Sequence, residues 1–248
     1  MSRDQFSVPV IPGQPPELVV YDRPSPCPYL KDRTARMPLR LPTRRLRRNE
    51  LEQRLVNGDR RQGLVLYRTR CPGCAACVPI RIPVGSFEMR RTHRRMLRRG
   101  DRELTVEIGP PVLDRRHVEL YNLHKERRGL AEGQLPIDID GYEDFLVNTC
   151  CDSFEMQYRV GPDLVGVAIA DRSLRSLSAV YCYYDPDCSR LGIGTYSILK
   201  QIELCRKLGL TYLYLGLYIA ESPAMHYKAT FLPHEQLLDG RWVPFERQ

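Results

Sequence analysis

Three cysteines stand at intervals of three residues in the segment CPGCAACVPIRIP, at positions 71, 74 and 77. Thiolates at this spacing can turn toward one point, and Cys27 in PCPYL offers a fourth. A set of four thiolates suits a structural zinc ion or an iron–sulfur cluster. The fourth cysteine is remote in sequence, unlike in paired Cys-x-x-Cys knuckles, so reduced thiols that pack a subdomain without metal are the alternative. The metal-ligand candidates are Cys27, Cys71, Cys74 and Cys77.

A second spacing with chemical meaning is the glycine turn GIGT, in which Gly192, Gly194 and Thr195 follow an expected strand and open an expected helix. Backbone N–H groups at a helix N-terminus point toward an anion and favour its binding. The alternative is a tight turn with a helix cap. The turn is therefore a candidate for binding phosphate or a carbonyl oxygen.

Basic residues are concentrated in the first part of the chain. Residues 1–110 carry 23 Lys and Arg against 11 Asp and Glu, whereas residues 111–248 carry 15 against 19. Such a basic part indicates a polyanion partner, most simply a nucleic acid; an ordinary solvated surface is the alternative. The strongest cluster predicts contact with an RNA backbone and comprises Arg90, Arg91, Arg94, Arg95, Arg98 and Arg99, with a second cluster at Arg44, Arg45, Arg47 and Arg48.

The elements that must position these residues change in character near residue 110. The pattern predicts helices over 49–63, 114–129 and, shortly after, 141–150, then strands over 154–160, 163–171 and 177–186. A helix over 192–210 and a strand over 211–219 complete a βαβ unit in a mixed sheet, so the fold class is α/β (α+β). We expect a smaller basic region with the cysteines over 1–110 and a catalytic half over 111–248.

No stretch has the features of a signal peptide, and no apolar run approaches the roughly 20 residues that a membrane span needs. Nine cysteines without an export signal are typical of reduced thiols. The expected compartment is the cytoplasm, with no membrane partner.

Six blocks occur in a characteristic order: CPYLKDRTARMPLR, YRTRCPGCAACVPIRIPV, LSAVYCYYDPD, GIGTYSILKQIELCRKLGL, YLYLGLYI and MHYKATFLPHEQLLDGRW. From Cys27 to Trp242 the chain resembles the bacterial aspartate/glutamate leucyltransferases, which are related to eukaryotic arginyl-tRNA–protein transferases. The resemblance implies a GNAT-like catalytic half that uses charged tRNA in place of acyl-CoA. It also implies an N-degron enzyme that transfers leucine from leucyl-tRNA to the α-amine of proteins beginning with Asp or Glu, marking them for degradation. Cysteine-rich segments of the eukaryotic relatives are associated with metal or cluster binding.

The resemblance gives roles to particular residues. The nucleophile is the acceptor's own α-amine, with a pKa of about 7.7–8.0, so the transfer needs no cofactor. Asp185 is the candidate for fixing or deprotonating this amine, with Tyr183 and Tyr184 beside it; an Asp-Pro turn is the alternative for Asp185. Lys228 is expected to pair with the acceptor carboxylate. Further candidates for the acceptor or aminoacyl site are His226, Tyr227 and Tyr218.

Three alternatives stay open at this point. An arginyl donor fits the same mechanism. An acetyl-CoA-dependent GNAT enzyme is disfavoured because Ser189 stands where that family usually has Gln or Arg before the glycine turn. A non-catalytic metal-knuckle RNA-binding protein would explain the cysteines and arginines but leave the βαβ half without a purpose.

Overall fold

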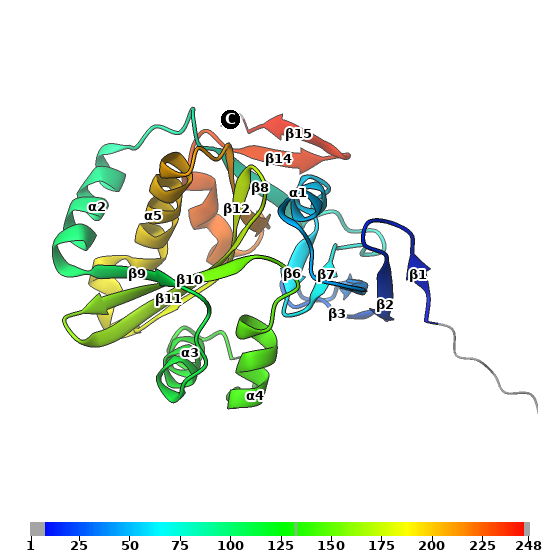
Figure 1. Ribbon diagram of the computed structural model, residues 1–248, viewed down its shortest axis with the longest axis horizontal. Helices are drawn as coiled ribbons and strands as arrows, with labels where there is room; N and C mark the ends of the chain where they lie inside the picture. The colour runs from blue at the N-terminus through cyan, green and yellow to red at the C-terminus, as the bar shows by residue number, and fades with distance from the viewer. Residues whose placement is uncertain (1–7, 132, 246–248) are drawn as a thin grey trace, which may run out of the picture.

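The computed structural model describes residues 8–131 and 133–245. An eight-stranded mixed sheet forms the centre, in the order β15-β14-β8-β13-β12-β11-β10-β9 (Figure 1). Only β12 and β13 pair in parallel within it; the other neighbours are antiparallel. The strands are β8 (Val78–Pro83), β9 (Thr105–Gly109), β10 (Ser153–Val160), β11 (Asp163–Arg172), β12 (Ser176–Tyr184), β13 (Tyr212–Tyr218), β14 (Glu235–Leu238) and β15 (Arg241–Pro244).

Helices cover both faces of this sheet. On one face α2 (Arg91–Glu103) and α5 (Ile193–Lys207) enclose the main apolar core. On the other face α3 (Arg115–Arg127), α4 (Ile139–Tyr142) and the π-helical turn η1 (Glu143–Val147) enclose a second core rich in tyrosine. None of the described helices is both long and apolar enough to cross a membrane.

A smaller five-stranded sheet lies beside the large one, in the order β1-β2-β5-β7-β6. Its strands are short because prolines and turns interrupt the N-terminal chain repeatedly. The elements of this part are β1 (Val10–Ile11), β2 (Glu17–Tyr21), β3 (Ser25–Pro26), β4 (Thr34–Ala35), β5 (Leu39–Pro42), α1 (Arg48–Val56), β6 (Arg60–Gln62) and β7 (Val65–Tyr67). The cysteine segment connects β7 to β8 and therefore links the small sheet to the large one.

The predicted mixed α/β architecture is confirmed. β12, α5 and β13 form the predicted βαβ unit, with Ser176 opposite Tyr212 in the parallel pair. The large sheet takes strands from both sides of residue 110, because β8 and β9 precede it. The predicted domain boundary at residue 110 therefore does not separate the strands of the large sheet. The division of the chain into regions 1–110 and 111–248 stays a prediction.

The helix predicted in the segment 49–63, with its end at Asn57-Gly58, is α1, and it ends at Val56; Gly58 takes a φ of 83° and turns the chain into β6. The arginine-rich segment, whose apolar residues make no clear stripe, folds as α2. Its buried stripe is His93, Leu97 and Gly100, two of which are not apolar by type.

Candidate active site

The site is built around the gap that opens between the parallel strands β12 and β13. The strands pair only as far as Ser178 and Tyr214 and then diverge. Beyond that point the Ala179 carbonyl oxygen accepts a hydrogen bond from Arg60 Nη2 at 3.0 Å. The Leu217 carbonyl oxygen accepts one from Lys228 Nζ at 2.6 Å. Two cations thus occupy the two edges of the gap, one from the small sheet and one from the C-terminal segment.

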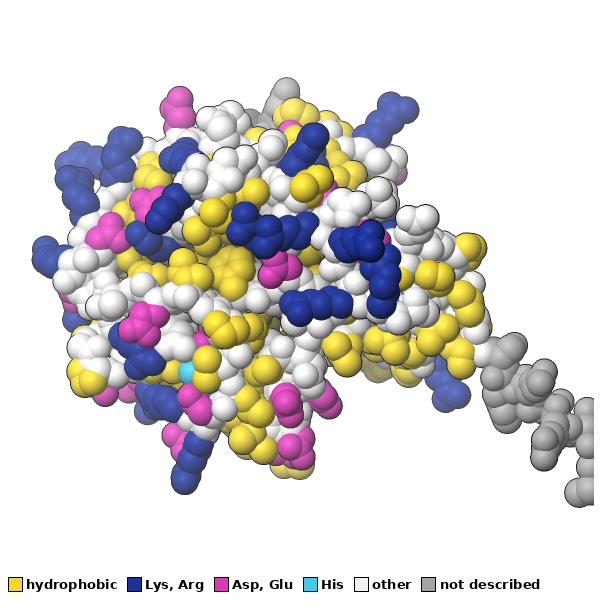
Figure 2. All heavy atoms as spheres, in the orientation of Figure 1, with side chains coloured by type: hydrophobic (Ala, Val, Ile, Leu, Met, Phe, Trp, Pro, Cys, Tyr) yellow, Lys and Arg dark blue, Asp and Glu magenta, His cyan; other side chains and the backbone are white. Residues whose placement is uncertain are grey.

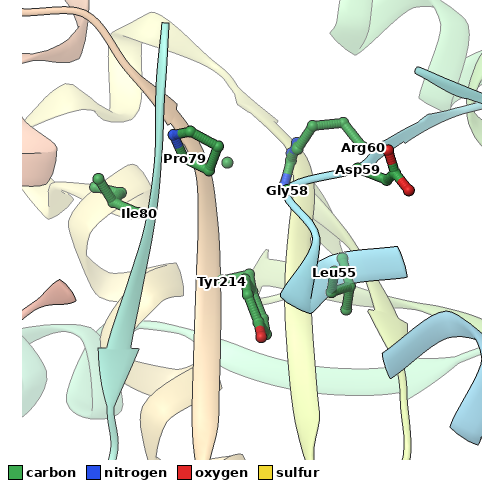
Figure 3. Close-up of a pocket in the computed structure, with 8 residues that line it drawn as sticks. Leu55, Gly58, Asp59, Arg60, Pro79, Ile80 and Tyr214 are labelled. Atoms are coloured by element: carbon green, nitrogen blue, oxygen red, sulfur yellow. The ribbon is translucent and has the colours of Figure 1, made fainter. Parts of the chain in front are cut away.

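A small cavity lies beside β13, next to Arg60. Figure 3 shows a cavity between the segment Leu55–Arg60 and residues Pro79, Ile80 and Tyr214 of β8 and β13. It has room for about one water molecule, which is too small for a substrate.

Lys228 has the electrostatic properties of a proton acceptor. It lies in the 3-10 segment η3 (Pro223–Thr230), which packs on β13. Burial, and to a smaller extent the positive charge of Arg60, lowers the pKa of Lys228 to about 7. A lysine in this condition is partly neutral at cellular pH, as a general base must be.

The two tyrosines at the end of β12 point to opposite faces, as alternation predicts. Tyr183 is fully buried in the second core, where its hydroxyl lies 2.5 Å from that of Tyr142. Tyr184 faces α5 and lies near Tyr227. Tyr227 is 44% exposed, and partial desolvation of its phenol, then the neighbours Cys182 and Tyr184, raises the pKa of Tyr227, so its phenol stays protonated and can donate a hydrogen bond.

The glycine turn adjoins the same end of β12. Gly192 adopts the left-handed conformation (φ 62°) and caps α5. A Cβ on Gly194 would lie 3.5 Å from the Tyr184 ring, which places the first turn of α5 beside the gap. Gly194 and Thr195 are half-buried in that turn. The N-terminus of α5 therefore directs its free N–H groups and partial positive charge toward the space where an ester carbonyl or phosphate would sit.

Three predicted residues have local roles in the structure. Asp185 Oδ1 accepts a hydrogen bond from the Asp187 amide at 2.9 Å and caps the 3-10 helix η2 (Pro186–Leu191). This is the turn role considered as its alternative, and its part in deprotonation stays a prediction. His226 is exposed, with Nε2 2.7 Å from the Ala220 carbonyl oxygen. Tyr218 is half-buried at the end of β13, opposite Val78.

The arginines predicted to contact RNA lie mostly on the exposed side of α2. Arg90, Arg91, Arg94 and Arg95 are exposed, and an open hollow is lined by Arg91, Thr92, Arg95 and Arg98. In Figure 2, Lys and Arg side chains gather at the edge of the face where Figure 1 places α2. A Cβ on Gly192 would meet Met96 of α2 at 3.0 Å, so this basic helix flanks the glycine turn.

The four cysteines proposed as metal ligands lie within electrostatic reach of one another. Burial, then Cys71, Cys27, Cys74 and Glu221, raises the pKa of Cys77 to about 12. Across residues 8–131 and 133–245, no three His, Cys, Asp or Glu side chains are arranged to hold a metal ion. No chemistry is derived from a metal here, and metal or cluster binding by these four cysteines stays a prediction.

Two residues at the site were not predicted from the sequence. Arg60 follows the turn Asn57–Asp59, where the pattern indicates only the end of a helix. His124 of α3 lies beneath the end of β12, with Nδ1 2.9 Å from the Tyr184 carbonyl oxygen and 3.2 Å from its amide nitrogen. Burial lowers the pKa of His124. Its occurrence within a helical pattern gave no signal, because the contact joins residues 60 positions apart.

Comparison with known proteins decides the family. The family model for the N terminus of arginine-tRNA-protein transferase matches residues 25–95, and the model for its C terminus matches residues 116–238. The chain belongs to the arginine-tRNA-protein transferase family. Its membership confirms the predicted resemblance and the predicted enzyme class, an aminoacyltransferase that uses tRNA as donor and protein as acceptor.

Curated relatives of this transferase match it over most of their length. The aspartate/glutamate leucyltransferase of Halorhodospira halophila is 40% identical over 217 residues, which cover 87% of this chain and 91% of the relative. The enzyme of the same name from Chromobacterium violaceum is 37% identical over 219 residues, covering 88% and 90%.

A solved structure shows the same fold. The C-terminal DUF2156 domain of a protein assigned as a lysylphosphatidylglycerol synthetase, from Agrobacterium fabrum, has a TM-score of 0.50 and 14% identity to the transferase. The match covers 68% of this chain and 58% of that one. The likeness concerns the fold alone and agrees with the predicted GNAT-like mixed sheet.

Proposed function

We propose that the transferase moves leucine from leucyl-tRNA to the N-terminal α-amine of proteins that begin with Asp or Glu. The names of the curated relatives support leucine as the acyl group and acidic residues as acceptors. The structural observation that carries the proposal is Lys228, a lysine of lowered pKa beside the gap between β12 and β13. The cytoplasm is the compartment in which charged tRNA and such acceptors meet.

The reaction is an ester-to-amide exchange. The neutral α-amine of the acceptor attacks the carbonyl carbon of the leucyl ester, and a nitrogen–carbon bond forms. Lys228 Nζ takes the proton that the amine must lose. The bond between the carbonyl carbon and the ribose oxygen then breaks, and Lys228 returns the proton to that oxygen. Atoms and charges balance without any further reactant.

Positioning and charge stabilisation supply the remaining catalysis. The backbone N–H groups of Gly194 and Thr195, in the first turn of α5, are placed to stabilise the oxyanion of the tetrahedral intermediate. The Tyr227 phenol, which has Tyr184 as a neighbour and is protonated at cellular pH, is a further hydrogen-bond donor. The exposed arginines of α2 hold the tRNA backbone, and such contacts give affinity without sequence reading.

The test is transfer of labelled leucine, and separately of labelled arginine, from charged tRNA to peptides that begin with Asp, Glu or Ala. We expect leucine on the Asp and Glu peptides alone. Transfer of arginine in place of leucine would leave the mechanism unchanged and indicate arginyl-tRNA as the donor. Binding of tRNA without transfer of either amino acid would contradict the proposed function.

A further inference from the structure

Arg60 is a cation without an ion-pair partner among the described residues, although both of its sequence neighbours form ion pairs. Asp59 binds Arg40 at 2.6 Å and Arg68 at 2.9 Å. Arg61 binds the buried Asp171 at 2.8 Å. Among the described residues, no carboxylate lies within ion-pair distance of Arg60. The backbone at Arg60 is therefore fixed from both sides, and its charge is left uncompensated.

The guanidinium of Arg60 is directed into the gap between the parallel strands. Nη1 donates to Ser178 Oγ at 3.3 Å and Nη2 donates to the Ala179 carbonyl oxygen at 3.0 Å. A Cβ on Gly216 of β13 would lie 2.7 Å from the guanidinium carbon. Gly216, with a φ of 79°, thus leaves the space that the guanidinium fills. Two of the five N–H donors of Arg60 are used in the hydrogen bonds of the described chain, and the others stay free for a ligand.

The ligand that fits this place is a carboxylate. A half-buried guanidinium with free donors prefers a planar anion that can accept two hydrogen bonds. Lys228 is a weaker candidate for the same anion, since its ammonium already donates to Leu217 and its pKa of about 7 leaves it partly neutral. The two cations at the gap therefore have different properties.

We propose that Arg60 binds the side-chain carboxylate of the acceptor's N-terminal Asp or Glu and so determines acceptor specificity. Lys228 then takes the proton that the α-amine loses. This inference rests on the proposed function. It also alters the expectation from the sequence, in which Lys228 alone pairs with the acidic side chain. Arg60 belongs to β6 of the small N-terminal sheet, so this sheet contributes the acceptor specificity of a reaction whose other groups lie on η3, α5 and α2.

The specificity has a physical origin in the uncompensated charge. An acidic acceptor compensates Arg60, whereas the isosteric Asn or Gln offers an amide whose NH₂ end cannot accept from the guanidinium. A site built for a charged partner discriminates strongly against such an analogue, because the buried charge is left poorly satisfied. Bound carboxylate also offsets the repulsion that Arg60 exerts on the ammonium form of Lys228. An acidic acceptor therefore raises the basicity of Lys228.

The experiment compares Arg60→Gln, Arg60→Lys and the wild-type chain in leucyl transfer to matched peptides that begin with Asp or Asn. Arg68→Gln is the control, since Arg68 pairs with Asp59 and, among the described residues, donates no hydrogen bond to β12 or β13. For Arg60→Gln we expect kcat/KM on the Asp peptide to fall at least about 30-fold, mainly through KM. Transfer to the Asn peptide should change by less than about threefold, so the preference for Asp collapses.

Arg60→Lys should keep a preference for the Asp peptide at reduced affinity, because lysine retains the positive charge but lacks the paired N–H donors of the guanidinium. This variant also serves if Arg60→Gln does not fold, which its circular dichroism spectrum would reveal. Unchanged Asp affinity in Arg60→Lys together with an unchanged Asp/Asn ratio in folded Arg60→Gln would overturn the proposal. An equal loss on both peptides would also overturn it, since it would indicate a purely structural role. Failure of the proposed function would instead appear as no leucyl transfer by the wild-type chain.

Discussion

Replacing Lys228 by methionine removes the proposed proton acceptor while keeping a side chain of similar length. The pKa of Lys228 is about 7, lowered by burial first and by Arg60 second. The adjacent Tyr227 has Tyr184 and Cys182 as its own neighbours, and desolvation raises the pKa of Tyr227 and of Cys182 to about 12. Lys228 itself is therefore expected to impose a pH dependence near neutrality.

The magnitude follows from two titrations. With a pKa of about 7, the neutral fraction of Lys228 rises from about 9% at pH 6 to about 50% at pH 7, a factor of about 5. The acceptor's α-amine, with a pKa of about 7.7–8.0, contributes a factor of about 9 over the same range. We expect kcat/KM of the wild-type chain to rise about 50-fold from pH 6 to pH 7.

The Lys228→Met variant should be slower and should retain only the factor of about 9. The assay is leucyl transfer to an Asp peptide at limiting peptide concentration, because kcat/KM reports the pKa values of the free enzyme and free acceptor. Lys207→Met, an exposed lysine at the end of α5, is the matched control. A rise of about 50-fold in Lys228→Met as well would refute the role of Lys228 as base.

Two further predictions concern the helix that carries the basic face. A Cβ on Gly100 would lie 2.3 Å from the Tyr196 ring, so Gly100→Ala should lower the free energy of unfolding by about 1–3 kcal/mol in urea titrations, although alanine favours helix. Gly109→Ala, with no atom within 4 Å of the added Cβ, is its control and should change stability little. Arg95→Gln should reduce the slope of log tRNA affinity against log salt by about 0.7–0.9, whereas Arg115→Gln on α3 should leave it unchanged. An unaltered slope in Arg95→Gln would place the tRNA elsewhere.

The βαβ unit was predictable from the sequence because its signals are local. The alternation in β12, the glycines at the turn and the helical spacing of Ile198, Leu199, Ile202 and Cys205 each act within a few residues. The same locality placed the glycine turn at the end of β12.

The buried stripe of α2 and the role of Arg60 depend on tertiary contacts and could not be predicted in this way. His93 belongs to the core because it packs with Phe87 and Phe231 in a cluster of three rings, with ring centroids 5.7 Å and 5.3 Å from its own. Gly100 belongs to it because the Tyr196 ring lies where a side chain would be. Arg60 reaches Ala179 across 119 positions of sequence. A sequence pattern that spans a few residues carries no information about partners so far away along the chain.

The central place of β8 in the large sheet has a consequence for synthesis on the ribosome. Its partner β13 is made about 130 residues later, so at about 5–20 residues per second β8 waits roughly 7–25 s for its first neighbour. An apolar strand left unpaired for that time is a target for association with other nascent chains. Pro79 and Pro83 lack N–H donors and Arg81 adds a charge, and these features oppose such pairing. Pro79, Arg81 and Pro83 thus belong to β8 in the folded sheet and also reduce its tendency to pair with other chains before the sheet forms.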